Sequence, residues 1–271
     1  MPAMTQPTEA AHASAAPEPS RAHVDALRSS VERLRDLAPP MSDEELTAGA
    51  YPTDWTVAQV LSHLGSGAVI MQRRLEDALA DKDTPEDFAP GVWHTWNAKG
   101  PVVQRDDSLA ADAALLACIE AVPPGERNEF AFAMGPMTLG FAQFVGMRLN
   151  EHAFHTWDIE VVADPAATIP LPVVALVVDN LELVARFTGK PTGDTPTTIT
   201  VATTAPERGF SVELTSDGVA LIPGAAGASP DVELPAEAFA RLVYGRLDTE
   251  HTPSGEHGPA LDVLRRLFPG P

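Results

Sequence analysis

Two residues four positions apart, Glu151 and His155, have the types and the spacing of metal ligands. Positions four apart in an α-helix lie on one face, one turn from each other. Arg148 and Asp158 continue the same polar stripe, whereas the residues that flank it are apolar. Polar groups on a mostly buried face need partners, and a carboxylate beside an imidazole is a good ligand pair for a divalent cation.

A third candidate ligand, His63, comes from an upstream segment. Apolar residues recur at three- and four-residue steps over 56–80, which predicts an amphipathic helix with His63 on its apolar side. Helical bundles build metal sites from ligands that different helices present inward. Two histidines and one glutamate would leave a coordination position open, as in catalytic zinc sites.

Purely structural roles fit the same residues. A histidine on an apolar face is often hydrogen-bonded within the core, and Glu151 and His155 could form an intrahelical pair. His152 could pair with His155 or face solvent, and Arg148 could pair with Glu151. The spacing alone leaves the metal site and these structural roles about equally supported.

Charge and composition restrict the classes of partner. The chain has 271 residues, 44% of them apolar, and a formal net charge of -20. Such a surface repels phosphate backbones and anionic bilayers, so we expect neither nucleic acid nor a membrane as partner. It also disfavours close self-association, so we expect a monomer or a weak homo-oligomer. Small molecules stay open as ligands, because the local field at a site can oppose the net charge.

The N-terminal segment and the single cysteine bear on the compartment. Residues 1–19 lack the basic start and hydrophobic run of a signal peptide, so we expect a disordered leader and a cytoplasmic protein. The sequence has no run of 18 consecutive apolar residues, so we expect no transmembrane helix. One cysteine, Cys118, allows no intrachain disulfide and has no base beside it, so we expect a small core residue.

Periodicity predicts an α+β fold in which a helical bundle precedes a small mixed domain. Besides 56–80, apolar residues recur with helical spacing over 20–37, 108–122, 138–163 and 171–188, which predicts a helix in each segment. Prolines, glycines and aromatics predict a loop, either a lid or a pocket wall, over 81–107. Period-two alternation predicts strands at 197–203, 210–215, 219–222 and 232–234, with helices over 235–247 and 260–268. We therefore expect a leader (1–19), a four- or five-helix bundle (20–189) and an α+β domain (190–271).

Several motifs resemble one family of helical proteins. The segment WTVAQVLSHL, residues 55–64, is similar to the opening motif of DinB-like metal-binding bundles. The segment RLNEHAFHTWD, residues 148–158, resembles the second motif of the mycothiol-dependent maleylpyruvate isomerase family. RLVYGRL (241–247) and LRRLFPG (264–270) resemble that family's small C-terminal domain. The resemblance spans roughly residues 22–270.

The resemblance implies a zinc ion held by His63, Glu151 and His155, with mycothiol as thiol co-substrate in an actinobacterial cytoplasm. Asp158 would then orient an imidazole without touching the metal; a helix-surface or interdomain hydrogen bond is its structural alternative. A zinc-bound thiol loses its proton near neutral pH, and the thiolate can attack an electrophilic carbon. Bond rotation and thiolate loss would make the protein a maleylpyruvate-type isomerase, whereas release of the adduct would make it a thiol S-transferase.

Arg241 and Arg246, both on the predicted 235–247 helix, are candidates to bind a substrate carboxylate, since a guanidinium pairs with it bidentately. Surface salt bridges are the alternative for both. Two other functions stay open: a non-catalytic metal- or small-molecule-binding or regulatory protein, and metal-assisted hydrolysis with His94 as base. Two histidines and a carboxylate also suit divalent metals other than zinc.

Overall fold

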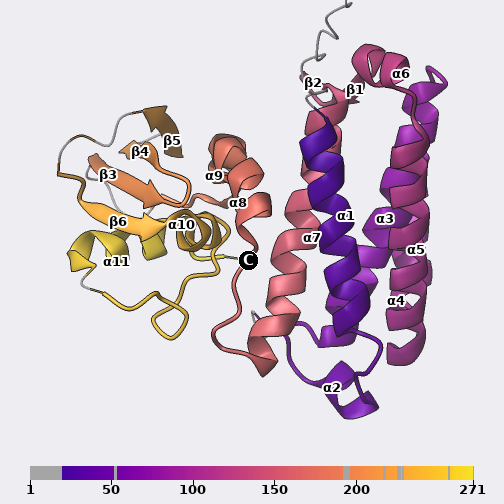
Figure 1. Ribbon diagram of the computed structural model, residues 1–271, viewed down its shortest axis with the longest axis horizontal. Helices are drawn as coiled ribbons and strands as arrows, with labels where there is room; N and C mark the ends of the chain where they lie inside the picture. Colours follow the sequence, from indigo (N-terminus) through magenta and orange to yellow (C-terminus); the bar gives the residue numbers. More distant parts are fainter. Residues whose placement is uncertain are drawn as a thin grey trace, which may run out of the picture.

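The computed structural model describes residues 20–51, 54–191, 196–215, 218–224, 227, 229–255 and 257–270. The expected leader, residues 1–19, lies outside the described residues. Figure 1 shows a helical region beside a sheet region, with α8 (Leu171–Val177) and α9 (Leu181–Thr188) on the side of the sheet that faces the helices. The predicted α+β class is confirmed, and the change from helices to strands falls between α9 and β3 (Thr197–Thr204). The division into separate domains stays a prediction.

The helical region runs from α1 to α7. Its helices are α1 (Arg21–Leu37), α2 (Asp43–Thr47), α3 (Val57–Leu79), α4 (Phe88–Asn97), α5 (Pro101–Ala121), α6 (Pro124–Glu129) and α7 (Phe141–Ala163). A short antiparallel hairpin, β1 (Phe132–Met134) and β2 (Met137–Leu139), precedes α7. Among the described residues, no helix is both long enough and apolar enough to cross a membrane.

The first turns of α3 and α7 are fixed by side-chain hydrogen bonds to the backbone. Thr56 Oγ1 accepts from Gln59 N at 3.3 Å, and Gln59 Oε1 accepts from Thr56 N at 2.8 Å, which together form a capping box. Gln143 Oε1 accepts from Gly140 N at 3.0 Å in the same way. Each such cap satisfies helix N–H groups that lack intrahelical partners. The caps therefore fix where each helix starts, and with it the positions of residues two to four turns later.

The sheet region contains four strands in the order β5-β4-β3-β6. Strands β3, β4 (Arg208–Thr215) and β5 (Gly218–Gly224) are antiparallel, and β6 (Val232–Pro235) pairs in parallel with β3. Helix α9 packs on β5, α10 (Ala236–Val243) packs on α9 and β3, and α11 (Gly258–Leu267) contacts β6. Alternating burial along β3 and β4 shows that one face of the sheet is covered, as their period-two sequence predicts.

One continuous apolar cluster joins the two regions. It includes Phe144 and Trp157 of α7, Val174 of α8, Val201 of β3 and Phe239 of α10, all at most 2% exposed. Burying each such side chain contributes about 1.5–3 kcal/mol. The helices and the sheet are therefore packed as one body, which gives any site at their junction fixed walls.

Three predicted element boundaries are wrong. Most of the predicted 81–107 loop is helical, because Pro90 and Pro101 lie in the first turns of α4 and α5, where no N–H donor is needed. The predicted 171–188 helix is interrupted by a 3-10 turn, η1 (Val178–Asn180). The predicted 235–247 helix ends at Val243, since Gly245 adopts a φ of +71°, which terminates a helix.

Candidate metal centre

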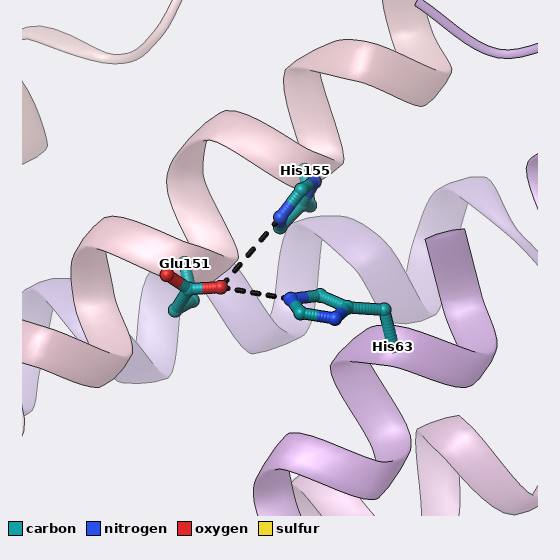
Figure 2. Close-up of side chains that lie close together, drawn as sticks. All are labelled: His63, Glu151 and His155. Atoms are coloured by element: carbon teal, nitrogen blue, oxygen red, sulfur yellow. Dashed lines mark hydrogen bonds and ion pairs between the residues drawn. The ribbon is translucent and has the colours of Figure 1, made fainter. Parts of the chain in front are cut away.

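The three predicted ligands come together at one point between α3 and α7. Glu151 Oε2 lies 2.9 Å from His63 Nε2 and 3.6 Å from His155 Nε2 (Figure 2). One donor atom from each residue lies within 4.8 Å of the other two. His63 comes from the middle of α3, and the other two residues occupy successive turns of α7. Packing of α3 against α7 has thus brought together residues 88 positions apart in the chain.

The donor set fits a metal ion. Two ligands that each bind a tetrahedral zinc at about 2.0–2.1 Å are about 3.3 Å from one another. The two separations from Glu151 Oε2, 2.9 and 3.6 Å, lie on either side of that value. Two imidazole nitrogens and one carboxylate oxygen suit zinc and other divalent metals. His63, Glu151 and His155 could therefore hold a metal ion.

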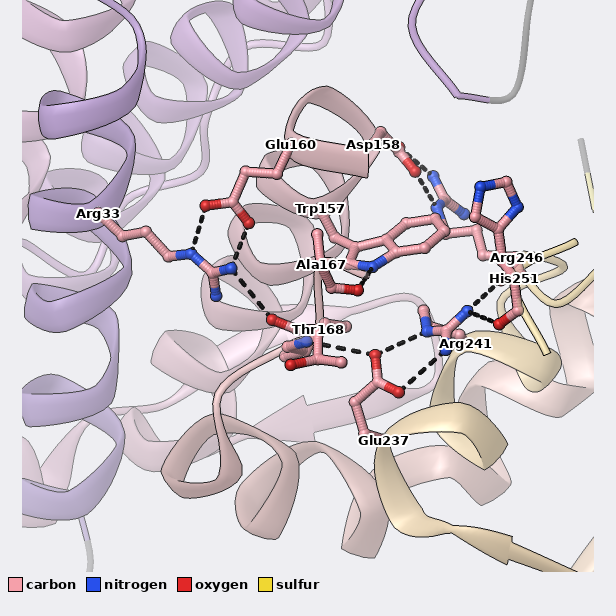
Figure 3. A network of polar contacts seen from close by, with 11 residues as sticks. Arg33, Trp157, Asp158, Glu160, Ala167, Thr168, Glu237, Arg241, Arg246 and His251 are labelled. Atoms are coloured by element: carbon pink, nitrogen blue, oxygen red, sulfur yellow. Dashed lines mark hydrogen bonds and ion pairs between the residues drawn. The ribbon is translucent and has the colours of Figure 1, made fainter. Parts of the chain in front are cut away.

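A buried carboxylate orients the His155 ring. Its Nδ1 lies 2.9 Å from Asp158 Oδ2, and Arg246 donates to both oxygens of Asp158 at 2.7 Å each. The Asp158 side chain is 1% exposed, and Figure 3 shows Arg246 reaching it from the segment after α10. A carboxylate on one imidazole nitrogen directs the other toward a metal and fixes the tautomer. Asp158 therefore contacts His155 on the ring nitrogen opposite the one nearest Glu151, and its role in orienting a metal ligand stays a prediction.

Glu151 and His155 stabilise each other's charged forms. Desolvation opposes ionisation of Glu151, but hydrogen bonds with His155 and His63 hold the pKa of its carboxyl well below the usual range. Desolvation also opposes protonation of His155, yet Asp158 and Glu151 raise the pKa of its imidazole. The two imidazoles thus stabilise the negative charge of Glu151, and the two carboxylates stabilise a positive charge on His155.

A cavity of about 500 Å³ opens beside the three ligands, where the helical and sheet regions meet. This volume is typical of small-molecule sites. The residues around it belong to α3, α7, α9, the segment before α3 and the segments that follow α9, α10 and α11. Its walls include the aromatic residues Tyr51, Trp55, Phe154, Phe187 and Tyr244, the cations Lys190 and Arg246, and the acids Asp54, Glu151 and Asp158. We call this space the junction cavity.

A second cavity, of about 530 Å³, lies between α3 and α4. His63 and Trp55 border both cavities. The remaining lining carries no charged group and consists of Gln59, Ser66, Trp93, Asn97 and Gln104. We call this space the α3–α4 cavity. Because the two cavities share His63, small molecules can approach the same ligand from two directions.

Trp55 forms the partition between the cavities. Its ring centroid lies 5.3 Å from that of His63 and 6.2 Å from that of His155. Sequence reasoning treated Trp55 only as part of a motif and missed Tyr244 and Lys190 altogether. The aromatic residues of 93–97 were the one available signal for the α3–α4 cavity, and they were assigned to a loop.

Two further polar residues of α7, Arg148 and His152, have partners away from the candidate site. Arg148 donates to the Asp112 carboxylate of α5 and, at 2.9 Å, to the Leu64 carbonyl of α3. His152 Nε2 lies 3.2 Å from the other oxygen of Asp112. Arg148 therefore pairs with Asp112 rather than Glu151, and His152 lies in the core rather than at the metal site.

Arg241 does not reach the junction cavity. Glu237 accepts from its guanidinium at 2.6 and 3.0 Å, and the carbonyl oxygens of Arg246 and His251 accept at 3.1 Å each (Figure 3). The Arg241 side chain is 4% exposed. Of the two predicted carboxylate-binding arginines, only Arg246 lines the cavity, and Arg241 supports the segment that carries it.

Two further candidates for chemistry lie elsewhere. Cys118 is half-buried in α5, and burial raises the pKa of its thiol, which keeps it protonated at neutral pH. His94 is exposed on α4 and is not among the residues that line either cavity, so it is not placed as a base for hydrolysis.

Comparisons with known proteins agree with this geometry. Residues 27–160 match the family model described as "Mycothiol maleylpyruvate isomerase N-terminal domain". The crystal structure of the mycothiol-dependent maleylpyruvate isomerase is similar at a TM-score of 0.60 and 14% identity, covering 83% of this chain and 88% of that one. A histidine-to-alanine mutant of that isomerase gives the same TM-score and coverage at 13% identity. No curated protein matches the sequence significantly. Residues 27–160 thus match the mycothiol maleylpyruvate isomerase N-terminal domain family, and over most of its length the chain shares the fold of that isomerase.

Proposed function

We propose that the chain is a zinc-dependent enzyme that activates a low-molecular-weight thiol, mycothiol, for attack on an electrophilic substrate. The observation that carries this proposal is the convergence of His63 Nε2, Glu151 Oε2 and His155 Nε2 on the wall of a cavity large enough for a small molecule. A purely structural cluster would not need an open cavity in front of it. The domain family supports the choice of thiol.

A divalent metal bound there would lower the pKa of a coordinated thiol, so that the thiol would be present as thiolate near neutral pH. The protein's own residues supply the rest. Asp158 holds His155 in its orientation, and Arg246 in turn holds Asp158 in place through two hydrogen bonds. Trp55 and Phe154 line the cavity with apolar surface, which limits the access of water to the reacting atoms.

The cations of the junction cavity suggest where the electrophile binds. Arg246 is bound to Asp158 through Nε and Nη2, whereas Lys190 has no ion pair among the described residues. Lys190 therefore provides local positive charge in a chain whose formal net charge is -20. A substrate carboxylate would be attracted there. The α3–α4 cavity carries no charged lining residue and offers the thiol a separate approach to His63.

The same site serves two outcomes. If the thiolate adds to a cis double bond, the bond rotates and the thiolate leaves, the product is the trans isomer and the thiol is recovered. If the thiolate displaces a leaving group or the adduct is released, the reaction is an S-transfer and the thiol is consumed. Consumption of the thiol therefore distinguishes the two reactions.

A non-catalytic role is the second candidate, and one contact favours it. Glu151 Oε2 and His63 Nε2 are already within hydrogen-bond distance, so the cluster can satisfy itself without a metal. Such a cluster would make the chain a small-molecule-binding or regulatory protein built on the same bundle.

Turnover separates these candidates. The zinc-loaded protein is incubated with mycothiol and either maleylpyruvate or monobromobimane, and loss of thiol and formation of product are followed. We expect turnover that requires both zinc and mycothiol and is lost in Glu151→Ala. The exposed His94→Ala variant is the matched control and should keep full activity. Zinc-loaded protein that turns over neither substrate would favour the non-catalytic role.

A further inference from the structure

A buried ionic network lies beside the candidate ligands, and its side chains are not among those that line the junction cavity. The side chains of Arg148 and Asp112 are each 2% exposed, and that of His152 is fully buried. Arg148 Nη2 donates to Asp112 Oδ1 and to the Leu64 carbonyl oxygen, and His152 Nε2 lies 3.2 Å from Asp112 Oδ2. These contacts connect α3, α5 and α7 through one guanidinium and one carboxylate.

The network is joined directly to the metal ligands. Leu64, whose carbonyl accepts from Arg148, is the residue after His63 on α3. Arg148 and His152 stand three residues before and one residue after Glu151 on α7. A sliding or rotation of α7 that moved Glu151 away from His63 would therefore also break the contact between Arg148 and Leu64.

Direct packing between α3 and α7 is less suited to fix the distance between His63 and Glu151. Helix α3 packs mainly on α5, and α7 packs mainly on α1. The two helices that carry the ligands are therefore held largely by different neighbours. Arg148 links α7 to α3 without an intermediary, and Asp112 links α7 to α5, the helix on which α3 rests. Metal ligands have to be placed within a few tenths of an ångström, which is a stricter requirement than apolar packing alone supplies.

The surrounding residues fit a positioning role better than a stabilising one. Arg148 Nε is buried without a hydrogen-bond partner among the described residues, which is unfavourable for stability. A Cβ atom at position 67 would lie 3.2 Å from Arg148 Nη1, so Gly67 leaves room for the guanidinium against α3. An apolar pair of similar size usually stabilises a core at least as well as a buried ion pair does.

We propose that Arg148 and Asp112 are positioning residues of the metal centre, which set the distance between His63 on α3 and the two ligands on α7. This inference rests on the proposed function, since it requires that the site binds a metal. It assigns to the core network a role in metal affinity in addition to its role in the fold.

The test is a double variant that removes the network without leaving a lone charge. In Arg148→Met/Asp112→Leu, both members of the ion pair become apolar side chains of comparable size. Zinc affinity is measured by competition with a chromophoric chelator, and stability of the metal-free protein by urea unfolding. We expect zinc affinity to fall about 10- to 100-fold, the range for residues that orient ligands. The urea midpoint should fall less than in a variant that leaves a cavity in the core, because the apolar pair offsets the lost ion pair and only the contact of His152 Nε2 with Asp112 is left unreplaced.

The matched control is Leu115→Ala, which removes a fully packed side chain from α5 one turn after Asp112. It should lower the urea midpoint and leave zinc affinity unchanged. If the double variant does not fold, Arg148→Lys replaces it. Lysine keeps the charge but lacks the planar fork that serves Asp112 and Leu64 together, so zinc affinity should fall about tenfold.

The outcomes separate this inference from the proposed function. Wild-type zinc affinity in a folded double variant, or in folded Arg148→Lys, would overturn the positioning role and leave the proposed function intact. An equal loss of affinity in Leu115→Ala would also overturn it, because loosening of α5 would then be sufficient. A wild-type protein that binds no zinc would overturn both.

Discussion

Helix α7 carries two histidines three residues apart, each beside a carboxylate, and their surroundings differ. His152 is fully buried, with Nε2 beside Asp112 and Nδ1 3.4 Å from the hydroxyl of Thr156. His155 has Nδ1 beside Asp158, but its Nε2 points toward Glu151 (Figure 2), and the residue lines the junction cavity. Both imidazoles have acidic partners, so the partner alone does not make a ligand. A ring nitrogen must also face another donor and open space.

The largest expected effects come from replacing each of the two histidines by alanine in turn. His155→Ala removes a ligand, so zinc affinity should fall by more than about 100-fold, beyond the range for orienting partners, with the fold retained. His152→Ala breaks a buried contact with Asp112, so it should lower the free energy of unfolding by about 2–4 kcal/mol and leave zinc stoichiometry unchanged. Elemental analysis and urea unfolding measure the two quantities. Zinc loss in His152→Ala with zinc retained in His155→Ala would reverse the assignment.

The next effect concerns the carboxylate behind His155. Asp158→Asn removes the charge that orients the ring and pairs with Arg246, so zinc affinity should fall about 10- to 100-fold. Isothermal titration with zinc measures the affinity. Asp54→Asn is the control, because Asp54 lines the same cavity and, among the described residues, forms no hydrogen bond or ion pair with either histidine ligand. An equal loss in both variants would show that general cavity charge matters, rather than the orientation of His155.

The carboxylate beside His152 predicts a pH effect on stability. Burial opposes ionisation of Asp112, but Arg148 and His152 hold the pKa of its carboxyl below its ordinary value of 3.8. The folded state therefore binds a proton less readily than the unfolded state, so the stabilisation is complete above about pH 4 and is lost as the pH falls further. Urea unfolding between pH 7 and pH 3 should show a weaker acid dependence in Arg148→Met/Asp112→Leu than in the wild type. Identical dependence in the two proteins would contradict the assignment.

The smallest effect should come from the glycine beside the network. Gly67→Ala gains about 1 kcal/mol of helix propensity but brings its Cβ to 3.2 Å from Arg148 Nη1, so the net change in unfolding free energy should be within about 1 kcal/mol. Zinc affinity should fall a few-fold as the guanidinium shifts, which chelator competition can detect. Gly65→Ala is the contrasting variant, since its Cβ would lie 2.3 Å from the Trp96 ring and 2.7 Å from the Ser108 Cα. It should destabilise the protein clearly more than Gly67→Ala.

The sequence predicted α3, α7 and the convergence of their polar residues because long amphipathic helices have a strong period. It did not predict the network, since Asp112 lies in an alanine-rich helix and nothing in its local pattern indicates that Arg148 will reach it. Pairing between distant helices depends on how they pack, which periodicity does not specify.

The errors have local causes. Pro90 and Pro101 were read as signs of a loop, although proline is well tolerated in the first turn of a helix, where both lie. Arg246 was placed on a helix that in fact ends before it, and the turn at Gly245 is what directs its side chain toward Asp158. A helical Arg246 would have followed the orientation of α10 instead.

The central claim is that His63, Glu151 and His155 form a metal site. Elemental analysis of the purified protein, beside the variants His63→Ala and Glu151→Ala and the control His94→Ala, tests it most directly. We predict about one zinc per chain in the wild type and in His94→Ala, with loss of zinc in the two ligand variants while circular dichroism shows the fold retained. No bound metal in the wild type, even after zinc is offered at neutral pH, would contradict the account and leave a hydrogen-bonded polar cluster at the cavity wall.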